Sequence, residues 1–205
     1  MEKQQISTVA YLLLPFIGLC DKIFKTKEKE VPQVEFNDVY DKYRNRTGQL
    51  HRRGTRWRFG EYGLVVCVWV YDGRGNILLT RRAPGKSFAG TWENSGGAVK
   101  AGESSRAAIV RELYEETGIL AEAEEFELIG STRDRHTHYD FYCLKRQTPI
   151  EEIVLLPGET DGVQWVSMEK VSQMVKDGQI CKIIGHQFRR QEAAIRQRQN
   201  AQEEM

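Results

Sequence analysis

The segment GGAVKAGESSRAAIVRELYEETGI, residues 96–119, decides the fold of this chain of 205 residues. It gathers four glutamates in a protein whose formal net charge is only +1. Glu112, Glu115 and Glu116 are spaced i, i+3 and i+4, so on a helix their carboxylates converge within one turn. Like charges at this spacing destabilise a helix, and the loop before it brings Glu103 toward the same end. The pattern therefore raises the question of what cancels the repulsion.

The residues around the glutamates predict the ends and the buried face of this helix. Ser104 or Ser105 can accept a hydrogen bond as the N-cap, and Gly118 can end the helix in the left-handed conformation. Ile109 and Leu113 lie on one apolar arc, which we expect to face the core.

Two interpretations of the acidic arc remain at this stage. Most glutamate pairs on helices form a solvated face. Here, however, glycines in the preceding loop let the backbone approach closely. The segment also offers only hard oxygen ligands, which Mg²⁺ and Mn²⁺ prefer. A divalent cation would cancel the repulsion, so the pattern favours a metal site.

The same segment resembles the Nudix box, G-x5-E-x7-R-E-U-x-E-E-x-G-U, in which U is a bulky apolar residue. Every fixed position is present at the family's spacing: Gly97, Glu103, Arg111, Glu112, Leu113, Glu115, Glu116, Gly118 and Ile119. The likeness extends from ILLTRRAPGKSFAGTWENSGG upstream to GVQWVSMEKV downstream, roughly residues 60–180.

This resemblance implies an α+β fold, an α/β/α sandwich in which a mixed β-sheet is flanked by helices. It also implies a hydrolase that cuts a diphosphate linkage in a nucleoside diphosphate derivative or related organic pyrophosphate. The cofactor would be Mg²⁺ or Mn²⁺, which neutralises the diphosphate oxygens and helps to deprotonate an attacking water.

The resemblance also assigns roles to individual residues. The expected metal ligands are Gly96, through its carbonyl oxygen, Glu103, Glu112, Glu115 and Glu116. Glu103 either joins this set or pairs with Arg111, which would hold the glutamates in place. The expected catalytic residues are Arg111, Glu112, Glu115 and Glu159. The base is either a box glutamate or Glu159 from a later loop, and a solvated loop acid is the other interpretation of Glu159.

Other polar residues are candidates for contact with the substrate. We expect these contacts from Arg81, Arg82, Lys86 and Glu93, which follow a predicted strand. Trp57 and Phe59 lie among the arginines of residues 52–58, and such interleaving can stack bases. One short cluster and a net charge near zero do not favour a stable nucleic-acid partner.

The rest of the chain predicts one main domain with extensions. We expect an apolar helix and polar connector in residues 1–35, the Nudix domain in 36–180 and a C-terminal helix in 181–205. The apolar run near the N-terminus has about 12 residues, whereas a membrane span needs about 20. We therefore expect no membrane contact, and a packed helix that is compatible with a homodimer. Widely spaced cysteines, two of them in apolar strands, fit a cytoplasmic location.

Two alternatives to the hydrolase remain open. TWENS is similar to a stretch of isopentenyl-diphosphate isomerases, which place an essential cysteine just after the Asn-Ser pair. Gly96 and Gly97 follow Ser95 here, so that cysteine is missing. A non-catalytic module that senses a nucleotide is the other alternative, although such proteins usually have eroded box glutamates.

Overall fold

The computed structural model describes residues 34–200. The predicted apolar N-terminal helix and the last residues of the predicted C-terminal segment lie outside this range. Within it, no helix is both long enough and apolar enough to cross a membrane.

The fold is built around the central strand β3 (Gly63–Tyr71), a continuous apolar run that is almost entirely buried. Along one edge β3 pairs in parallel with β8 (Thr137–Lys145), and β7 (Glu127–Asp134) continues the sheet beyond β8. Such a continuous hydrophobic run is typical of a strand in a sheet whose two faces are both covered.

The other edge of β3 is shared between two strands. β6 (Ser95–Ala98) pairs with the first half of β3, and β4 (Asn76–Arg82) meets β3 only at Tyr71 and Ile77. β4 then diverges to pair with β9 (Thr160–Ser167) and with the short β5 (Trp92–Glu93). This divergence separates β4 and β9 from β6.

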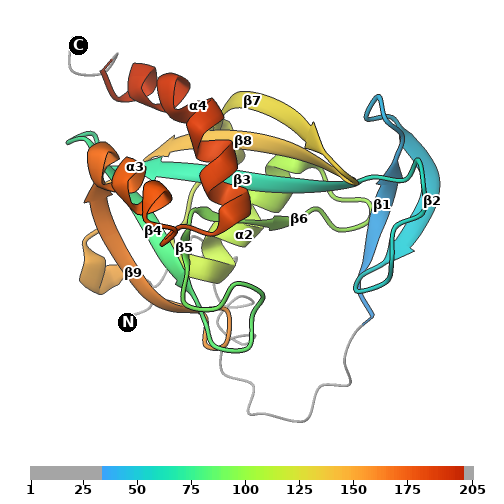
Figure 1. The fold of residues 1–205 in the computed structure, drawn as a ribbon, viewed down its shortest axis with the longest axis horizontal. Helices are drawn as coiled ribbons and strands as arrows, with labels where there is room; N and C mark the ends of the chain where they lie inside the picture. The colour runs from blue at the N-terminus through green and yellow to red at the C-terminus, as the bar shows by residue number, and fades with distance from the viewer. Residues whose placement is uncertain (1–33, 201–205) are drawn as a thin grey trace, which may run out of the picture. The chain divides into compact units, whose positions relative to one another are not determined.

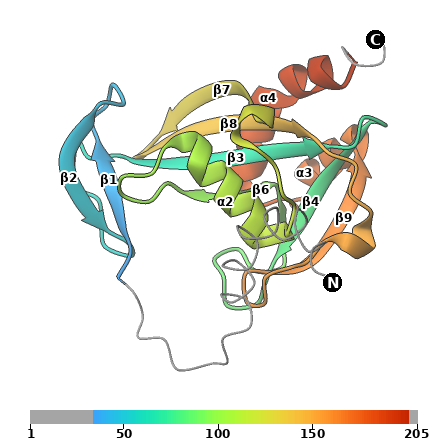
Figure 2. The same cartoon turned by 180° about the vertical axis from the view of Figure 1, so that it is seen from behind.

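Helices cover both faces of the sheet (Figures 1 and 2). α2 (Ser105–Thr117) packs on one face, where Ile109 and Leu113 join a buried cluster with Val66 and Val68. α3 (Met168–Lys176) and α4 (Lys182–Asn200) cover the other face, whose cluster includes Trp69. Two 3₁₀ turns, Ala123–Glu125 and Ile150–Glu152, complete the elements. The predicted α/β/α sandwich with a mixed sheet is confirmed.

Local signals fixed the ends of α2 as predicted. Ser104, rather than Ser105, is the N-cap and accepts a hydrogen bond from the Ala107 amide at 3.1 Å. Gly118 has φ = 70° and donates its amide to the Tyr114 carbonyl at 2.8 Å. The glutamates are thus placed on a helix with defined ends.

A separate two-stranded sheet of β1 (Phe36–Tyr40) and β2 (Arg46–Arg52) was not predicted as strands. Its residues are mixed rather than alternating, and most of β2 is exposed. Three hydrogen bonds tie β1 to the loop before α2. The Asn37 side-chain amide donates to the Val99 carbonyl at 2.7 Å. The backbone amide of Ala101 donates to the Phe36 carbonyl at 2.8 Å, and that of Gly102 donates to the Asp38 carboxylate at 2.9 Å. This hairpin therefore has a defined position beside the glutamate-rich segment.

Candidate active site

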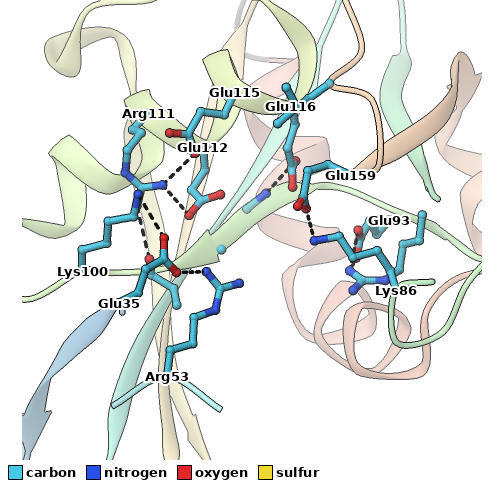
Figure 3. A pocket seen from close by; sticks show the side chains of 15 residues that line it. Glu35, Arg53, Lys86, Glu93, Lys100, Arg111, Glu112, Glu115, Glu116 and Glu159 are labelled. Atoms are coloured by element: carbon cyan, nitrogen blue, oxygen red, sulfur yellow. Dashed lines mark hydrogen bonds and ion pairs between the residues drawn. The ribbon is translucent and has the colours of Figure 1, made fainter. Parts of the chain in front are cut away.

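A polar cleft of about 270 Å³ lies where β4 and β9 separate from β6 and α2. Acidic and basic side chains from five different parts of the chain line it (Figure 3). These are Glu35, Arg53, Arg82, Lys86, Glu93, Lys100, Arg111, Glu112, Glu115, Glu116 and Glu159.

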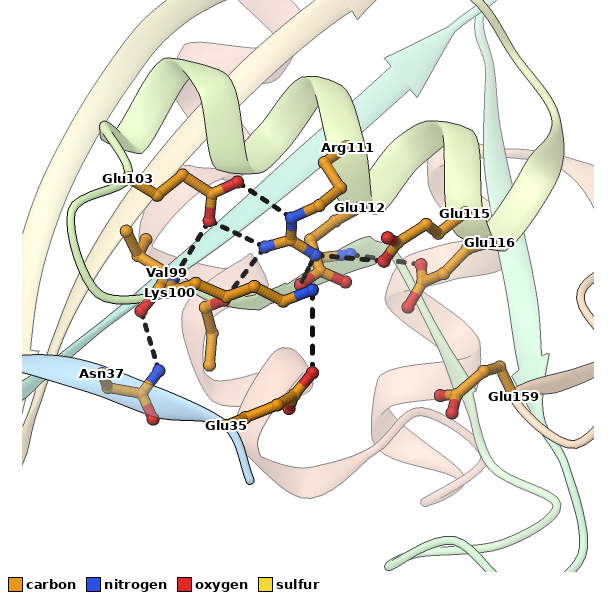
Figure 4. A network of polar contacts seen from close by, with 12 residues as sticks. Glu35, Asn37, Val99, Lys100, Glu103, Arg111, Glu112, Glu115, Glu116 and Glu159 are labelled. Carbon is orange, nitrogen blue, oxygen red and sulfur yellow. Dashed lines mark hydrogen bonds and ion pairs between the residues drawn. The ribbon is translucent and has the colours of Figure 1, made fainter. Parts of the chain in front are cut away.

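Arg111 is the centre of an ion-pair network on one wall of the cleft (Figure 4). Its Nε and Nη2 donate to the two carboxylate oxygens of Glu103 at 2.8 and 2.9 Å. Its Nη1 donates to Glu112 at 2.7 Å and to Glu115 at 3.0 Å. Burial would raise the pKa of Glu103, but hydrogen bonds from Arg111 and from the Lys100 amide outweigh it and hold that pKa below its ordinary value. Glu103 does not itself line the cleft.

Glu112 lies directly over Gly97. A Cβ at position 97 would stand 2.4 Å from the Glu112 carboxylate, a distance that real Cβ contacts do not show. The close approach of β6 to α2 thus explains the glycine at this place in the box. Burial, together with the charge of Glu115, raises the pKa of Glu112 despite the pairing with Arg111.

Replacing Gly97 by Ala should displace the Glu112 carboxylate and weaken the activity with little backbone strain, because Gly97 does not have a positive φ. We expect kcat/KM to fall by about 10-fold to 100-fold, as for changes that misplace a ligand. Steady-state kinetics measures this, with Ala101→Ser in the exposed part of the same loop as the control. Equal activity of the two variants would contradict the close packing.

Among the four glutamates of the box, Glu116 is the one that forms no ion pair with any of residues 34–200. Its Oε2 accepts a hydrogen bond from the Gly96 amide at 3.2 Å. Burial, followed by the charges of Glu93 and Glu112, raises its pKa well above the ordinary value. A charge in such surroundings is costly unless a cation neutralises it.

The opposite wall carries Arg82 and Lys86, each of which forms an ion pair with a glutamate. Arg82 Nη1 donates to both oxygens of Glu93 at 2.7 and 2.6 Å, and Lys86 forms an ion pair with Glu159. Burial raises the pKa of Glu93 although the Arg82 guanidinium opposes this shift.

The structure does not bring Arg81 to the cleft, contrary to its predicted contact with the substrate. Arg81 precedes Arg82 on β4, so its side chain leaves the opposite face of the strand. Its Nε donates to Asp161 at 2.7 Å instead.

The carboxylate oxygens of Glu112, Glu115 and Glu116 suit a hard divalent cation, but in this structure they do not converge on one point. No three carboxylate, imidazole or thiol groups of residues 34–200 converge closely enough to hold a metal. Arg111 engages Glu112 and Glu115, whereas Glu116 faces the cleft without a counter-charge. These residues are suited to a divalent cation because α2 supplies carboxylate oxygens and the Glu116 carboxylate has no ion pair in the part of the chain that the structure describes.

Three charged residues that line the cleft were not predicted from the sequence. Glu35 and Arg53 flank the hairpin and form an ion pair with each other, and Lys100 Nζ lies 3.6 Å from Glu35. No local pattern marks Glu35 and Arg53, because they reach the cleft only through the packing of β1 and β2. The run of arginines in residues 52–58 was the one signal available.

Residues 61–182 match the sequence model of the NUDIX domain. The chain belongs to the Nudix family. An uncharacterised Nudix hydrolase of Listeria monocytogenes is 24% identical over 150 residues, which cover 69% of this chain and 85% of that protein. An isopentenyl-diphosphate Delta-isomerase of Halorhodospira halophila is 30% identical over 115 residues, or 53% of this chain and 66% of that enzyme.

The fold comparison agrees with this membership. A crystal structure of a Deinococcus radiodurans protein superposes with a TM-score of 0.62 at 23% identity. The match covers 72% of this chain and 92% of the other. It supports the Nudix fold, and Glu112, Glu115 and Glu116 of this Nudix hydrolase line one wall of the cleft.

Proposed function

We propose that this Nudix hydrolase cleaves a diphosphate linkage in a nucleoside diphosphate derivative or related organic pyrophosphate, with Mg²⁺ or Mn²⁺ as cofactor. The observation that carries the proposal is the unpaired Glu116 carboxylate, which faces a cleft whose other wall presents Arg82 and Lys86. The Glu116 carboxylate suits a cation, and Arg82 and Lys86, each paired with a glutamate, suit phosphate oxygens, so the cleft matches a metal-bound diphosphate.

Three glutamates of α2 would hold the cation: Glu112, Glu115 and Glu116, together with the Gly96 carbonyl oxygen. When bound, the metal supplies neutralisation of the diphosphate oxygens and activation of a water. Glu103 is tied to Arg111 by two hydrogen bonds, which supports a positioning role for both residues rather than a place for Glu103 among the ligands. Arg82 and Lys86 would bind phosphate oxygens, with Glu93 orienting Arg82.

Glu159 is our candidate for the general base. Its carboxylate lines the cleft opposite α2, is about half exposed and pairs with Lys86, which holds it in place (Figure 3). It would accept the proton of the attacking water, and a box glutamate, Glu112 or Glu115, is the alternative.

The variant Glu159→Gln should lower kcat by about 10²-fold to 10⁴-fold with little change in KM, as the loss of a general base does. Single-turnover kinetics at saturating substrate measures it. Asp161→Asn is the matched control, because this acid pairs with Arg81 outside the cleft. A normal kcat for Glu159→Gln would assign the base to the box.

Metal affinity should rise with pH. The pKa values of Glu112 and Glu116 lie above the ordinary 4.5, so protons compete with the cation until the pH exceeds them. The folded, metal-free protein also keeps protons that the unfolded chain has already released. Its stability from these two groups therefore falls as the pH rises from 4.5 toward the folded pKa values. Calorimetric titration with Mn²⁺ from about pH 5 to about pH 8 tests this, and an affinity independent of pH would contradict it.

A panel of nucleoside diphosphate derivatives and sugar diphosphates, assayed for released phosphate or monophosphate with Mg²⁺ or Mn²⁺, tests the proposed function. Failure to cleave any compound and failure to bind Mn²⁺ would overturn the proposed function.

Conversion of isopentenyl diphosphate would favour the isomerase instead. Gly96 pairs with Cys67 on β3, and the buried Cys67 thiol has its pKa raised by that burial, so an acid-base thiol is not supplied there.

A further inference from the structure

Asp140 on β8 is a buried acid, 1% exposed, that lies outside the lining of the catalytic cleft. Its Oδ2 accepts a hydrogen bond from the Ser105 hydroxyl at 2.5 Å and forms an ion pair with Arg44. Its Oδ1 accepts a hydrogen bond from the Ser131 hydroxyl at 2.7 Å. A buried carboxylate is costly unless it is paired and hydrogen-bonded, and these three partners meet that need. The proposed reaction does not involve this carboxylate, so its burial calls for another explanation.

Two of the partners of Asp140 belong to different parts of the active site. Ser105 is the first residue of α2, whose later turns carry the three glutamates that line the cleft. Arg44 lies in the turn between β1 and β2. In this hairpin, Glu35 directly precedes β1 and Arg53 directly follows β2, and both line the cleft. Asp140 therefore links the helix of the glutamates to the hairpin.

Asp140 also lies in register with the glycine under α2. It pairs with Val66 of β3, and Val66 pairs with Gly97 of β6. The three residues form one row across the sheet on the face that α2 covers, with Asp140 two strands, or about 10 Å, from Gly97. α2 is thus attached to the sheet at its first residue by Asp140, and its position is set again two turns later, where Glu112 lies over Gly97.

The turn that carries Arg44 is held in a defined shape. Arg44 has φ = 71°, a left-handed conformation that is unfavourable for a residue with a side chain and persists where surrounding contacts hold it. The Asp41 carboxylate closes the turn by accepting a hydrogen bond from the Asn45 amide at 2.9 Å. The Asp41 carbonyl accepts a second one from His138 of β8 at 2.8 Å. A preorganised turn therefore directs the Arg44 guanidinium at Asp140.

Polar contacts rather than apolar burial hold the hairpin. Most of β2 is exposed, so few buried apolar side chains attach it to the main sheet. The Arg44 guanidinium meets a carboxylate that is removed from solvent, and water screens such a pair less than an exposed one. At the cleft end of the hairpin, Glu35 pairs with Arg53 and lies 3.6 Å from Lys100 Nζ (Figure 3). The place of this charged group in the cleft thus depends on where the hairpin stands.

We propose that Asp140 is a positioning residue of the active site. By binding Arg44 and Ser105 together, it fixes the hairpin relative to α2. Arg53 and Glu35 are thereby held at the distance from the metal ligands at which they contact a bound diphosphate substrate. This inference rests on the proposed function and adds to it a residue that touches neither the metal nor the substrate.

Steady-state kinetics of full-length Asp140→Asn tests this role, with the nucleoside diphosphate derivative that the wild type cleaves fastest. The amide keeps the size of the side chain and still accepts from Ser105, but it lacks the charge that holds Arg44. We expect KM to rise by about 3-fold to 30-fold and kcat to stay within about twofold, as for a residue that couples two parts of a site. The affinity for Mn²⁺, measured calorimetrically, should stay within about twofold, because the proposed ligands belong to α2 and β6 and not to the hairpin.

Arg44→Gly and Ser105→Ala break the two links of Asp140 separately. Glycine suits the positive φ at position 44, so this variant removes the side chain without adding backbone strain. Each variant should raise KM. The double variant should exceed the more impaired single variant by no more than about twofold, because breaking either link already frees the hairpin. Arg44→Lys keeps a cation and should recover part of the loss.

Arg198→Ala is the matched control. Arg198 is comparably exposed to Arg44 and pairs with Glu127 of β7, so it ties α4 to the sheet and carries no wall of the cleft. At a temperature well below its Tm, its KM and its affinity for Mn²⁺ should stay within about twofold of the wild type.

The outcomes separate this inference from the proposed function. If Asp140→Asn has the KM of Arg198→Ala while diphosphates are cleaved, the positioning role is overturned and the hydrolase stands. The role is also overturned if the affinity for Mn²⁺ falls in step with the rise in KM, since that shows a general loosening of α2. A double variant whose KM is the product of the two single effects contradicts it as well. A wild type that neither cleaves a diphosphate nor binds Mn²⁺ overturns the proposed function, and the inference fails with it.

Discussion

Replacing Glu116 by Gln should produce a protein that is more stable without metal and almost inactive with it. The amide removes a carboxylate whose pKa is raised by burial and by Glu93 and Glu112, so the metal-free fold no longer has to hold that charge. We expect the free energy of unfolding to rise by about 1–3 kcal/mol. For a protein of this size each kcal/mol corresponds to about 2–4 °C in Tm.

The same substitution removes a donor that we assign to the cation. We expect kcat/KM to fall by at least about 10²-fold to 10³-fold, as when a preorganised electrostatic group is lost from an active site. Addition of Mn²⁺ should stabilise the wild type and leave the Tm of Glu116→Gln nearly unchanged.

Thermal unfolding with and without Mn²⁺, together with kinetics, measures these effects. Glu124→Gln, at an exposed position in the turn after α2, is the control. Glu115→Gln should also abolish turnover without unfolding the protein. If Glu116→Gln lowers the Tm of the metal-free protein, the Glu116 carboxylate stabilises the fold, and its role as a metal ligand is contradicted.

Loss of Arg111 should have the opposite effect on stability. In Arg111→Ala the carboxylates of Glu103, Glu112 and Glu115 lose their shared counter-charge, and two of them are less than one-fifth exposed. Removing one partner of a buried ion pair costs about 3–5 kcal/mol, and partial exposure reduces this to about 3 kcal/mol here. The Tm should fall by about 6–12 °C.

Arg111→Lys should recover only part of this loss, because a lysine cannot donate in parallel to both Glu103 oxygens and also reach Glu112. Arg196→Ala is the control, since Arg196 pairs with two glutamates on an exposed face and its loss should cost at most about 1 kcal/mol. Equal destabilisation by Arg111→Ala and Arg196→Ala would show that the network on α2 adds nothing to an ordinary surface pair. Denaturant unfolding followed by circular dichroism gives both values.

The sequence contained most of the site on α2 because that part is local. The caps at Ser104 and Gly118 and the buried face through Ile109 and Leu113 follow from helical periodicity. The spacing of the glutamates follows from the same rule. The contacts of these glutamates could not be predicted in detail, because they depend on how β6 packs under α2. That packing alone shows why position 97 needs a glycine.

The hairpin was beyond sequence reasoning for a physical reason. β2 is largely exposed, so it lacks the alternation of apolar and polar residues that marks a half-buried strand. Arg53 and Glu35 enter the cleft through contacts that are distant in the sequence. Arg81 and Arg82 differ for a similar reason: adjacent residues of a strand face opposite sides, and the sequence alone does not say which side holds the cleft.

The parallel pairing of β3 with β8 also constrains the order of folding. Residues 72–136 separate these two strands in the sequence, and closing so long a loop costs entropy before its contacts form. All the box glutamates lie within that loop, and α2 is held against the sheet by contacts such as that of the Ser105 hydroxyl with Tyr142 of β8, which form only after the two strands have paired. A bound cation should therefore slow unfolding more than it speeds refolding. Stopped-flow measurements with and without Mg²⁺ compare the two rates, and a larger effect on refolding would reverse this order.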